Sequence, residues 1–557
     1  MSRRWPKTTQ FHELTLRRHD LTCHVCGSAL HHRVTRRRCV YRFDGPTRVA
    51  CHLVRCTNPD CSAYNQLLGP EEERHVAPPQ WRIDWDLLLW MGFRRYKRHW
   101  SIPQLQAELR DTYDVTLSVA LIADYLRRYQ TMVAARHQAV PQLRQAYRDV
   151  PELVLTIDGI QPEKGHETVY VVRELRQQRI WFAESLLSSA TEEIQAVIRR
   201  ARLVAERLDI PVCGWMSDKQ EAFVTAIAAE FPGTPHRYCA NHFLRDLAAP
   251  MLAVDSAAKI RMRHKVRGLR ALERLCLPSP PAFVDTSERL TPTQHQGAAQ
   301  IVLSYCAAVR GILNDAQGGP LWPPGWNMAY ALREIGQSLE RNLTCSPTPI
   351  TSLLKRLRGF IQRGLTEYEK DQGRIATTLG QVLMVWALIH PEPGRHHAYH
   401  TSFQQVAEQY CQAKDSTTQY IGQLMLSFEA GLFCGGEALD LPEDNLDLER
   451  WIKGPKGHER HITGRQHVGL RMVAEAPTLL PAFDAHLSRN TPFTIDDLLP
   501  YVDAAIPASQ QEAMTRHRMM RKARSKKNEV APWNSLKRTI NCLSHGVISN
   551  RPSLSSL

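Results

Sequence analysis

The chain has 557 residues, with 71 Lys and Arg against 56 Asp and Glu and a formal charge of +15. This length predicts three or four domains, and 43% apolar with 23% charged residues is typical of a soluble protein that builds real cores. The most apolar stretch, 382–389, is too short for the ~20 residues that a membrane span requires. No apolar segment follows the basic N-terminus, so we expect no secretion signal.

The charge excess is uneven and indicates a polyanionic partner. Residues 1–40 hold nine Lys and Arg against two acids, and the segment 516–538 holds nine against Glu529 alone. Both segments are typical of basic arms that bind the phosphate backbone of a nucleic acid, and the alternative is a solvated basic surface. Six of the fourteen Cys lie in the first 61 residues, which fits a reducing cytosol and one metal site better than a disulfide framework. We therefore expect a cytoplasmic, nucleoid-associated protein of a prokaryote.

Two cysteine pairs predict a zinc ribbon over residues 1–76. Cys23 and Cys26 share a tight turn with a glycine, and Cys56 and Cys61 share a second turn about thirty residues later. The β-prone basic segments 36–43 and 47–54 separate them, and structural zinc would replace the core that so short a module lacks. Buried reduced cysteines are the alternative. Four further residues are alternative ligands: Cys39, Cys51, His24 and His52.

Residues 80–148 predict a helix-turn-helix domain after the linker 77–79. A helix over 84–98 has a basic end, and Ser101 to Gln104 resembles a capping box that opens a second helix burying Leu105 and Leu109. A break at 111–114 precedes a third helix over 118–132, which carries Arg127 and Arg128. These arginines suit a major-groove reader, although a helical hairpin with a solvated basic face fits the pattern nearly as well.

The segment 150–250 predicts an α/β core. Strands are expected at 154–160, 168–175 and 179–184, followed by a helix over 191–208 and a fourth strand over 212–216. Three antiparallel strands, a helix and a parallel strand are the order of a ribonuclease-H-like fold, in which the first and fourth strands are neighbours. Asp158 lies on the first strand and Asp218 follows the fourth, so we expect them to share a cation site.

The run "SDKQEAFVTAIAAEFPGTPHRYCANHFLRDL" resembles the region around the second aspartate of DDE transposases of the Mutator-like superfamily. Cys239 and His242 match the Cys-x-x-His signature of that group, and "LTIDGIQPEKG" resembles its first-aspartate strand. Two residues make an incomplete zinc site, so we interpret them as scaffolding beside the active site. The alternative is a buried thiol and a helix-capping histidine.

The resemblance implies a helical insertion over 251–430 and a third carboxylate on a final core helix within 431–480. Helical segments are expected near 258–274, 292–315, 327–341, 349–370, 374–390 and 402–430. Asn445 and Glu449 would share one helical face, and Glu449 is the expected third acid. Glu443, Asp447 and Glu437 are alternatives, and all four can also be solvated helix surface.

Basic residues after Glu449 are expected to contact scissile-strand phosphates: Lys456, Arg460 and Arg465. Gly454 and Pro455 are expected to break the helix before them. The insertion contains an aromatic loop from Trp322 to Trp326. We expect it either to stack on a base near the element end or to pack structurally, and packing is the more common role of paired tryptophans. Residues 481–557 are expected to form a basic C-terminal tail.

Together these features predict an α/β ribonuclease-H-like core interrupted by an all-α insertion, with an N-terminal zinc ribbon and helix-turn-helix. The resemblance implies a transposase in which Asp158, Asp218 and Glu449 bind two Mg²⁺ (or Mn²⁺) ions. Its partners would be double-stranded DNA, at element ends and target, and a second copy in a homodimer or larger assembly, with no membrane. A nuclease or resolvase on the same fold, and a non-catalytic DNA-binding regulator, are the alternatives.

Overall fold

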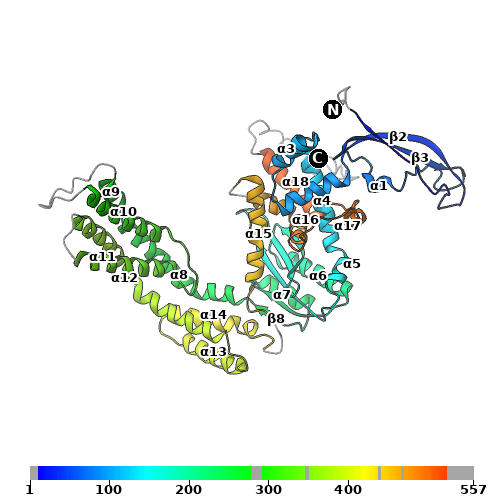
Figure 1. Ribbon diagram of the computed structural model, residues 1–557. Helices are drawn as coiled ribbons and strands as arrows, with labels where there is room; N and C mark the ends of the chain where they lie inside the picture. The colour runs from blue at the N-terminus through cyan, green and yellow to red at the C-terminus, as the bar shows by residue number, and fades with distance from the viewer. Residues whose placement is uncertain (1–9, 278–291, 345–349, 437–440, 466–468, 524–557) are drawn as a thin grey trace, which may run out of the picture. The chain divides into compact units, whose positions relative to one another are not determined.

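The computed structural model describes the chain except for residues 1–9, 278–291, 345–349, 437–440, 466–468 and 524–557 (Figure 1). Two compact units make up the chain. The first comprises 1–215, 220–234 and 446–557, and the second comprises 216–219 and 235–445. Within the described ranges, no helix is long and apolar enough to cross a membrane.

A three-stranded sheet opens the first unit. Strands β2 (Leu30–Arg42) and β3 (Gly45–Cys56) pair antiparallel, and β1 (His12–Leu16) pairs parallel with β3, giving the order β1-β3-β2. Gly45 has φ +120° in the turn between β2 and β3, a conformation that favours glycine. Both predicted strands are confirmed and run further than predicted, because Val40, Val49 and Leu53 alternate into a small core.

Five helices follow: α1 (Glu73–Val76), α2 (Trp85–Lys97), α3 (Ile102–Tyr113), α4 (Val119–Gln138) and α5 (Val140–Ala146). The predicted capping box is confirmed, since the Gln104 amide donates to Ser101 Oγ and the Ser101 amide donates to Gln104 Oε1. Leu105 and Leu109 are fully buried, as predicted. Helix α4 extends six residues beyond the predicted end because its last turns are buried as well.

The central sheet of the chain has five strands: β4 (Leu153–Ile160), β5 (Thr168–Glu174), β6 (Arg179–Leu186), β7 (Val212–Ser217) and β8 (His236–Tyr238). Their order is β6-β5-β4-β7-β8, and the β4–β5 and β5–β6 pairs are antiparallel. Helix α6 (Thr191–Leu208) joins β6 to β7, and α7 (Glu221–Glu230) follows β7. The predicted pairing of the first and fourth strands of this core is confirmed.

Helices cover both faces of this sheet in the first unit. On one face, Tyr170, Val172 and Trp181 pack with residues of α6 and α7. On the other face, Val171 and Ile180 join the core formed by α2, α4 and later helices. The fold is therefore mixed α/β.

The chain returns to the first unit with α15 (Leu446–Thr463), α16 (Gly469–Leu487), α17 (Ile495–Leu498), a 3-10 turn (Leu499–Tyr501) and α18 (Ala508–Ala523). Helix α16 docks on the sheet, where the Asp484 carboxylate accepts a hydrogen bond of 3.0 Å from the Ile180 amide. It also carries Arg471, which pairs with Glu459 at 2.7 Å and Glu475 at 3.2 Å. The predicted basic tail beyond Ala523 lies outside the described residues.

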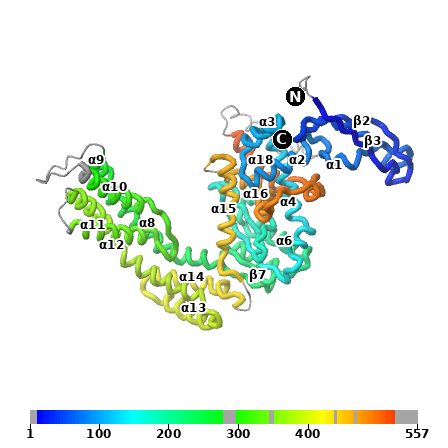
Figure 2. Tube along the Cα trace, in the orientation of Figure 1, coloured from blue at the N-terminus to red at the C-terminus, as the bar shows by residue number. Residues whose placement is uncertain are grey.

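Apart from β8, the second unit is built of helices (Figure 2). Their buried apolar residues form a common core. Its helices are α8 (Ala240–Lys265), α9 (Leu269–Cys276), α10 (Pro292–Asn314), α11 (Pro324–Thr344), α12 (Thr351–Leu388), α13 (His396–Cys411) and α14 (Ser416–Leu432).

Three predicted segment boundaries in this unit were wrong. The segments 349–370 and 374–390 form the single helix α12, because packing of Tyr368 and Ile375 outweighs the cost of Gly373. The segment 402–430 is two helices, since Asp415 caps the start of α14. The segment 258–274 is divided by Gly268, whose φ of +104° ends one helix and opens the next.

Candidate functional site

The four predicted zinc ligands come together. The Sγ atoms of Cys23, Cys26, Cys56 and Cys61 all lie within 4.8 Å of one another. Cys23 and Cys61 are 3.8 Å apart and Cys26 and Cys56 are 3.5 Å apart. A tetrahedral zinc with Zn–S bonds of ~2.3 Å places its sulfurs about 3.8 Å apart, so this donor set fits structural zinc.

The four thiols differ in their electrostatics. Hydrogen bonds from Ser28 lower the pKa of Cys26 to about 6, while desolvation raises the pKa of Cys56 to about 12. A metal ion that binds four thiolates would compensate for the cost of ionising Cys56, because its charge favours the deprotonated form.

The alternative ligands lie outside this group. Cys51 is fully buried in the separate core of β1 and β3, where burial raises its pKa to about 11. Cys39 sits on β2 opposite Arg48, and His52 is on β3 opposite Thr35. His24 is exposed. Among the described residues, none of these four belongs to a group of metal-ligating side chains.

Asp158 lies on β4 in the first unit and is half-buried. Its cross-strand partner on β5 is Val171, which belongs to the core shared with α15 and α16. Leu153, Leu155 and Ile157 pack on the opposite face. Strand alternation therefore puts Asp158 on the face of the sheet that the C-terminal helices cover.

Asp218 directly follows β7 and belongs to the second unit. The Ser217 hydroxyl donates to the Asp218 carbonyl at 2.6 Å and lies 2.8 Å from His236 Nε2. The Ser217 carbonyl accepts a bond of 2.9 Å from the Cys239 amide. Burial lowers the pKa of His236 to about 4, so its ring is neutral and fixes this turn as a hydrogen-bond partner.

Cys239 and His242 lie at the start of α8. Cys239 is the N-cap residue, is 1% exposed, and its Sγ accepts a hydrogen bond from the Asn445 amide at 3.4 Å. Burial raises its pKa, so it is a neutral thiol. Cys239 thus holds the turn before Asp218 and the segment before α15, which supports the scaffolding interpretation. His242 is half-buried, and neither residue belongs to a metal-ligating group in the described part of the chain.

Glu449 lies in the first turn of α15 and is half-buried. The predicted helix break after it was wrong, because α15 continues through Pro455 to Thr463. Leu448 and Ile452 are buried in the core with Val171, and Gly454 lies against Phe483. This packing outweighs the ~3 kcal/mol that an interior proline costs.

The alternative third acids and the predicted phosphate-contacting residues differ in their exposure. Asp447 and Glu443 are exposed, Asp447 pairs with Arg450, and Glu437 lies outside the described residues. Lys456 is half-buried and Arg460 is exposed, both on α15, while Arg465 is exposed just beyond it.

The predicted groove-reading arginines have an acidic neighbour on their own helix. Asp124 pairs with Arg128 at 3.1 Å and with Arg127 at 3.6 Å. This contact reduces the net charge that the two arginines offer to a phosphate.

The aromatic loop of the second unit has two different tryptophans. Trp322 is 68% exposed, whereas Trp326 packs against the helical core. The buried Asp255 accepts hydrogen bonds from the Gly325 and Trp326 amides and fixes the loop. Packing is therefore the role of Trp326, and stacking on a base stays a prediction for Trp322.

One further group was not predicted. His166, Glu167 and His517 offer ligand atoms within 4.8 Å of one another. Glu167 is buried and binds Arg516 Nε at 3.0 Å and His517 Nε2 at 3.1 Å. No sequence pattern could have linked Glu167 with His517, because they lie 350 positions apart. This group and the thiols are the two found among the described residues, so the three-carboxylate site stays a prediction.

In comparisons of the sequence with known proteins, no protein-family model and no curated protein matches this chain.

Proposed function

We propose that this protein is a DDE-type DNA transposase with a ribonuclease-H-like core, in which Asp158, Asp218 and Glu449 hold two Mg²⁺ (or Mn²⁺) ions. One observation carries the proposal. Strand β4, which bears Asp158, pairs with β7, and Asp218 is the next residue after β7. Acids on neighbouring strands of one sheet can converge on the same ions, and metal-assisted phosphoryl transfer depends on such convergent ligands.

The position of α15 supports Glu449 as the third ligand. Leu448, the residue before Glu449, is fully buried in the same core as Val171, the cross-strand partner of Asp158. The start of α15 therefore lies in the same core as the strand face that carries Asp158, which supports Glu449 as its partner. Asp158 and Glu449 are both half-buried, which suits groups that must reach a substrate and an ion.

The reaction would proceed in two displacements at one site. Bound divalent ions would supply Lewis-acid activation of the attacking and leaving oxygens. The carboxylates of the chain would hold those ions, and water would attack a phosphorus at the element end and displace a 3′-oxygen, which leaves as a hydroxyl. That 3′-hydroxyl would then attack a target phosphodiester and displace its 3′-oxygen, so that each step breaks one P–O bond and forms another.

The remaining modules would hold the DNA. The zinc module and helices α2 to α4, acting as a helix-turn-helix, would select and hold the element ends. Lys456, Arg460 and Arg465 would contribute phosphate contacts, which position the substrate without reading its sequence. Recognition of two element ends at once would require a homodimer or a larger assembly.

A catalytically inactive DNA-binding regulator is the second candidate function. It is favoured by the basic excess of +15, which DNA binding by itself requires and which needs no carboxylate site. A nuclease on the same fold would keep all three acids and cleave without joining strands.

The test is a nicking and joining assay with Mg²⁺ on DNA that carries the sequences flanking the gene. Asp158→Asn and Asp218→Asn preserve side-chain size and should abolish nicking. Asp149→Asn is the matched control, because the Asp149 side chain is 85% exposed and pairs with its neighbour Arg148 at 3.6 Å. Equal nicking by all four proteins would contradict the site, and nicking without joined products would indicate a nuclease. DNA binding without metal-dependent nicking in the wild type would indicate the regulator.

A further inference from the structure

An arginine-lined hollow of about 300 Å³ lies in the helical second unit, and none of its lining residues belongs to the sites described above. Its lining comes from the end of α8, the turn at Gly268, the start of α9 and the end of α10. Four arginines surround it: Arg263, Arg267, Arg270 and Arg310. Its floor is apolar, with Val266, Leu269 and Leu313 all buried.

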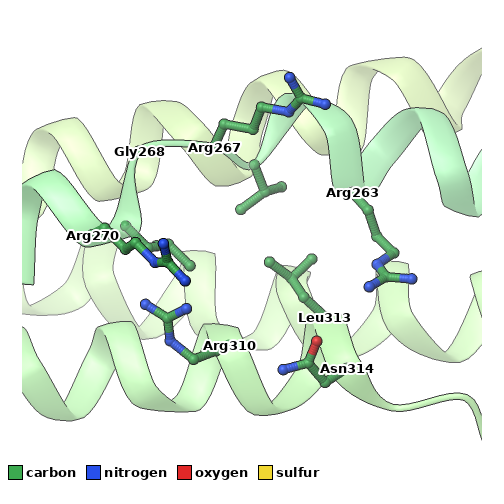
Figure 3. A pocket seen from close by; sticks show the side chains of 9 residues that line it. Arg263, Arg267, Gly268, Arg270, Arg310, Leu313 and Asn314 are labelled. Atoms are coloured by element: carbon green, nitrogen blue, oxygen red, sulfur yellow. The ribbon is translucent and has the colours of Figure 1, made fainter.

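The orientation of the arginines is uneven (Figure 3). Arg270 and Arg310 direct their guanidinium groups toward each other at one end of the hollow. Arg263 extends at the other end, near Leu313 and Asn314, while Arg267 points away. Like charges that face each other in a concave site repel unless an anion lies between them.

Little of this charge is neutralised by the protein. Arg310 pairs with Glu273 at 2.5 Å. Among the residues that the structure describes, no carboxylate lies within ion-pair distance of Arg263, Arg267 or Arg270, and Arg267 contacts only the His264 ring. The lining contains no acid. The start of α9 brings the positive end of a helix dipole to the rim, whereas the ends of α8 and α10 bring negative ends, so the positive field of the hollow comes from its arginines.

The turn that shapes the rim requires glycine. Gly268 has φ +104°, and a Cβ there would lie 2.9 Å from the Phe360 ring. This residue lets the chain reverse between α8 and α9, so that Arg263 and Arg270 flank one hollow.

We infer that this hollow binds two successive phosphates of double-stranded DNA, with Arg270 on one phosphate, Arg263 on the other, and the apolar floor against the sugar between them. The inference rests on the proposed function for its choice of DNA. A cationic rim over an apolar floor suits a phosphate with a sugar attached, whereas a divalent cation would find no carboxylate here. The charge of +15 makes a polyanion the expected partner.

The experiment measures binding of a labelled 30-base-pair duplex to the full chain by fluorescence anisotropy over a range of salt concentrations. The double variant Arg263→Gln/Arg270→Gln leaves the Arg310–Glu273 pair in place. The matched control is Arg356→Gln/Arg374→Gln, which removes two exposed arginines of α12 in the same unit and therefore the same charge. Circular dichroism melting verifies that both variants fold like the wild type.

Each phosphate contact contributes about 0.9 to the slope of log K against log salt, so the hollow variant should lose about 1.8 from that slope and bind roughly tenfold more weakly. The control should keep the wild-type slope. Equal losses in both variants would overturn the inference, since they would reflect general charge.

Two further measurements separate the sources and the functions. Titration with inorganic pyrophosphate tests for a free phosphate ligand, and binding of pyrophosphate at the hollow with unchanged DNA affinity would overturn the DNA assignment. Mg²⁺-dependent nicking is measured in parallel at saturating protein. If the hollow variant loses salt slope while the wild type shows no nicking, the result would support the hollow as a DNA contact and refute the proposed catalysis.

Discussion

Replacement of Cys61 by serine should release the metal of the N-terminal module and unfold its two cysteine turns. The core at this end contains six buried residues, three of which are the thiols Cys23, Cys56 and Cys61. Leu30, Val54 and Ala63, with the partly buried Tyr64 and Leu68 against them, remain as apolar packing if the metal is lost. Burial of side chains of this kind contributes at most about 1.5–3 kcal/mol each, which is too little to order two loops.

The expected loss can be compared with the stability of a whole domain. Structural zinc contributes about 10–16 kcal/mol of apparent binding free energy in small modules, whereas entire domains are stable by about 5–15 kcal/mol. The turns should therefore unfold, while β4 to β6 and the helices that cover them keep their structure through separate cores.

Hydrogen exchange with and without a strong zinc chelator measures this change. The amides of Cys23 and Gly27, which donate to Ser28 and Cys23 carbonyls at 2.8 and 2.9 Å, should lose protection in the variant and in chelator. Cys39→Ser is the matched control and should retain one zinc per chain. Unchanged exchange at these amides in metal-free protein, or full zinc content in Cys61→Ser, would refute the assignment.

Three further predictions concern buried ionisable groups. Burial raises the pKa of Asp84 to about 6, so the folded state holds a proton more tightly than the unfolded chain and stability falls as pH rises from about 4 to 6. Asp84→Asn, which still caps α2, should stabilise the protein at pH 8 by at most about 3 kcal/mol in urea unfolding, and a loss of stability would contradict this. Burial lowers the pKa of His486 to about 3, so the folded state favours the neutral ring. The unfolding free energy that this preference contributes is lost as pH falls from 6.5 toward 3, by about 1.4 kcal/mol per pH unit. His486 hydrogen-bonds with Tyr129. His486→Gln should make the unfolding free energy less dependent on pH between 6.5 and 3, and an unchanged pH dependence would contradict this prediction. Glu167→Gln breaks the buried pair with His517 and should lower the unfolding free energy by about 2–3 kcal/mol and expose α18 to exchange, whereas a change below about 0.5 kcal/mol would show the pair to be neutral.

Features written in short stretches of sequence were predicted well. The capping box at Ser101, the helix over 191–208 and both cysteine pairs depend on residues a few positions apart, and each is present in the structure. The break at Pro455 was predicted from the same kind of local rule and was wrong. Burial of Leu448 and Ile452 decided that case, and no local pattern reports on tertiary packing.

Contacts between distant residues were mostly beyond the sequence. The group of His166, Glu167 and His517 joins a hairpin to a helix near the end of the described chain. The pairing of Arg471 with Glu459 depends on how α15 and α16 meet. Charged residues are common on helix surfaces, so a sequence gives no sign of which few will be buried and paired.

The pairing of β4 with β7 is the long-range contact that the sequence did predict, and physical reasons make it predictable. Residues Leu153 to Ile157 are buried throughout and, apart from Thr156, apolar, as a central strand requires. The hairpin to β5 occupies one edge of β4, so the other edge needs a partner. A strand that follows the crossover helix α6 can satisfy that edge, and Leu153 donates its amide to Pro211 at the start of β7. The proposal that Asp158 and Asp218 share a metal site depends on this pairing, because Asp158 lies late in β4 and Asp218 directly follows β7.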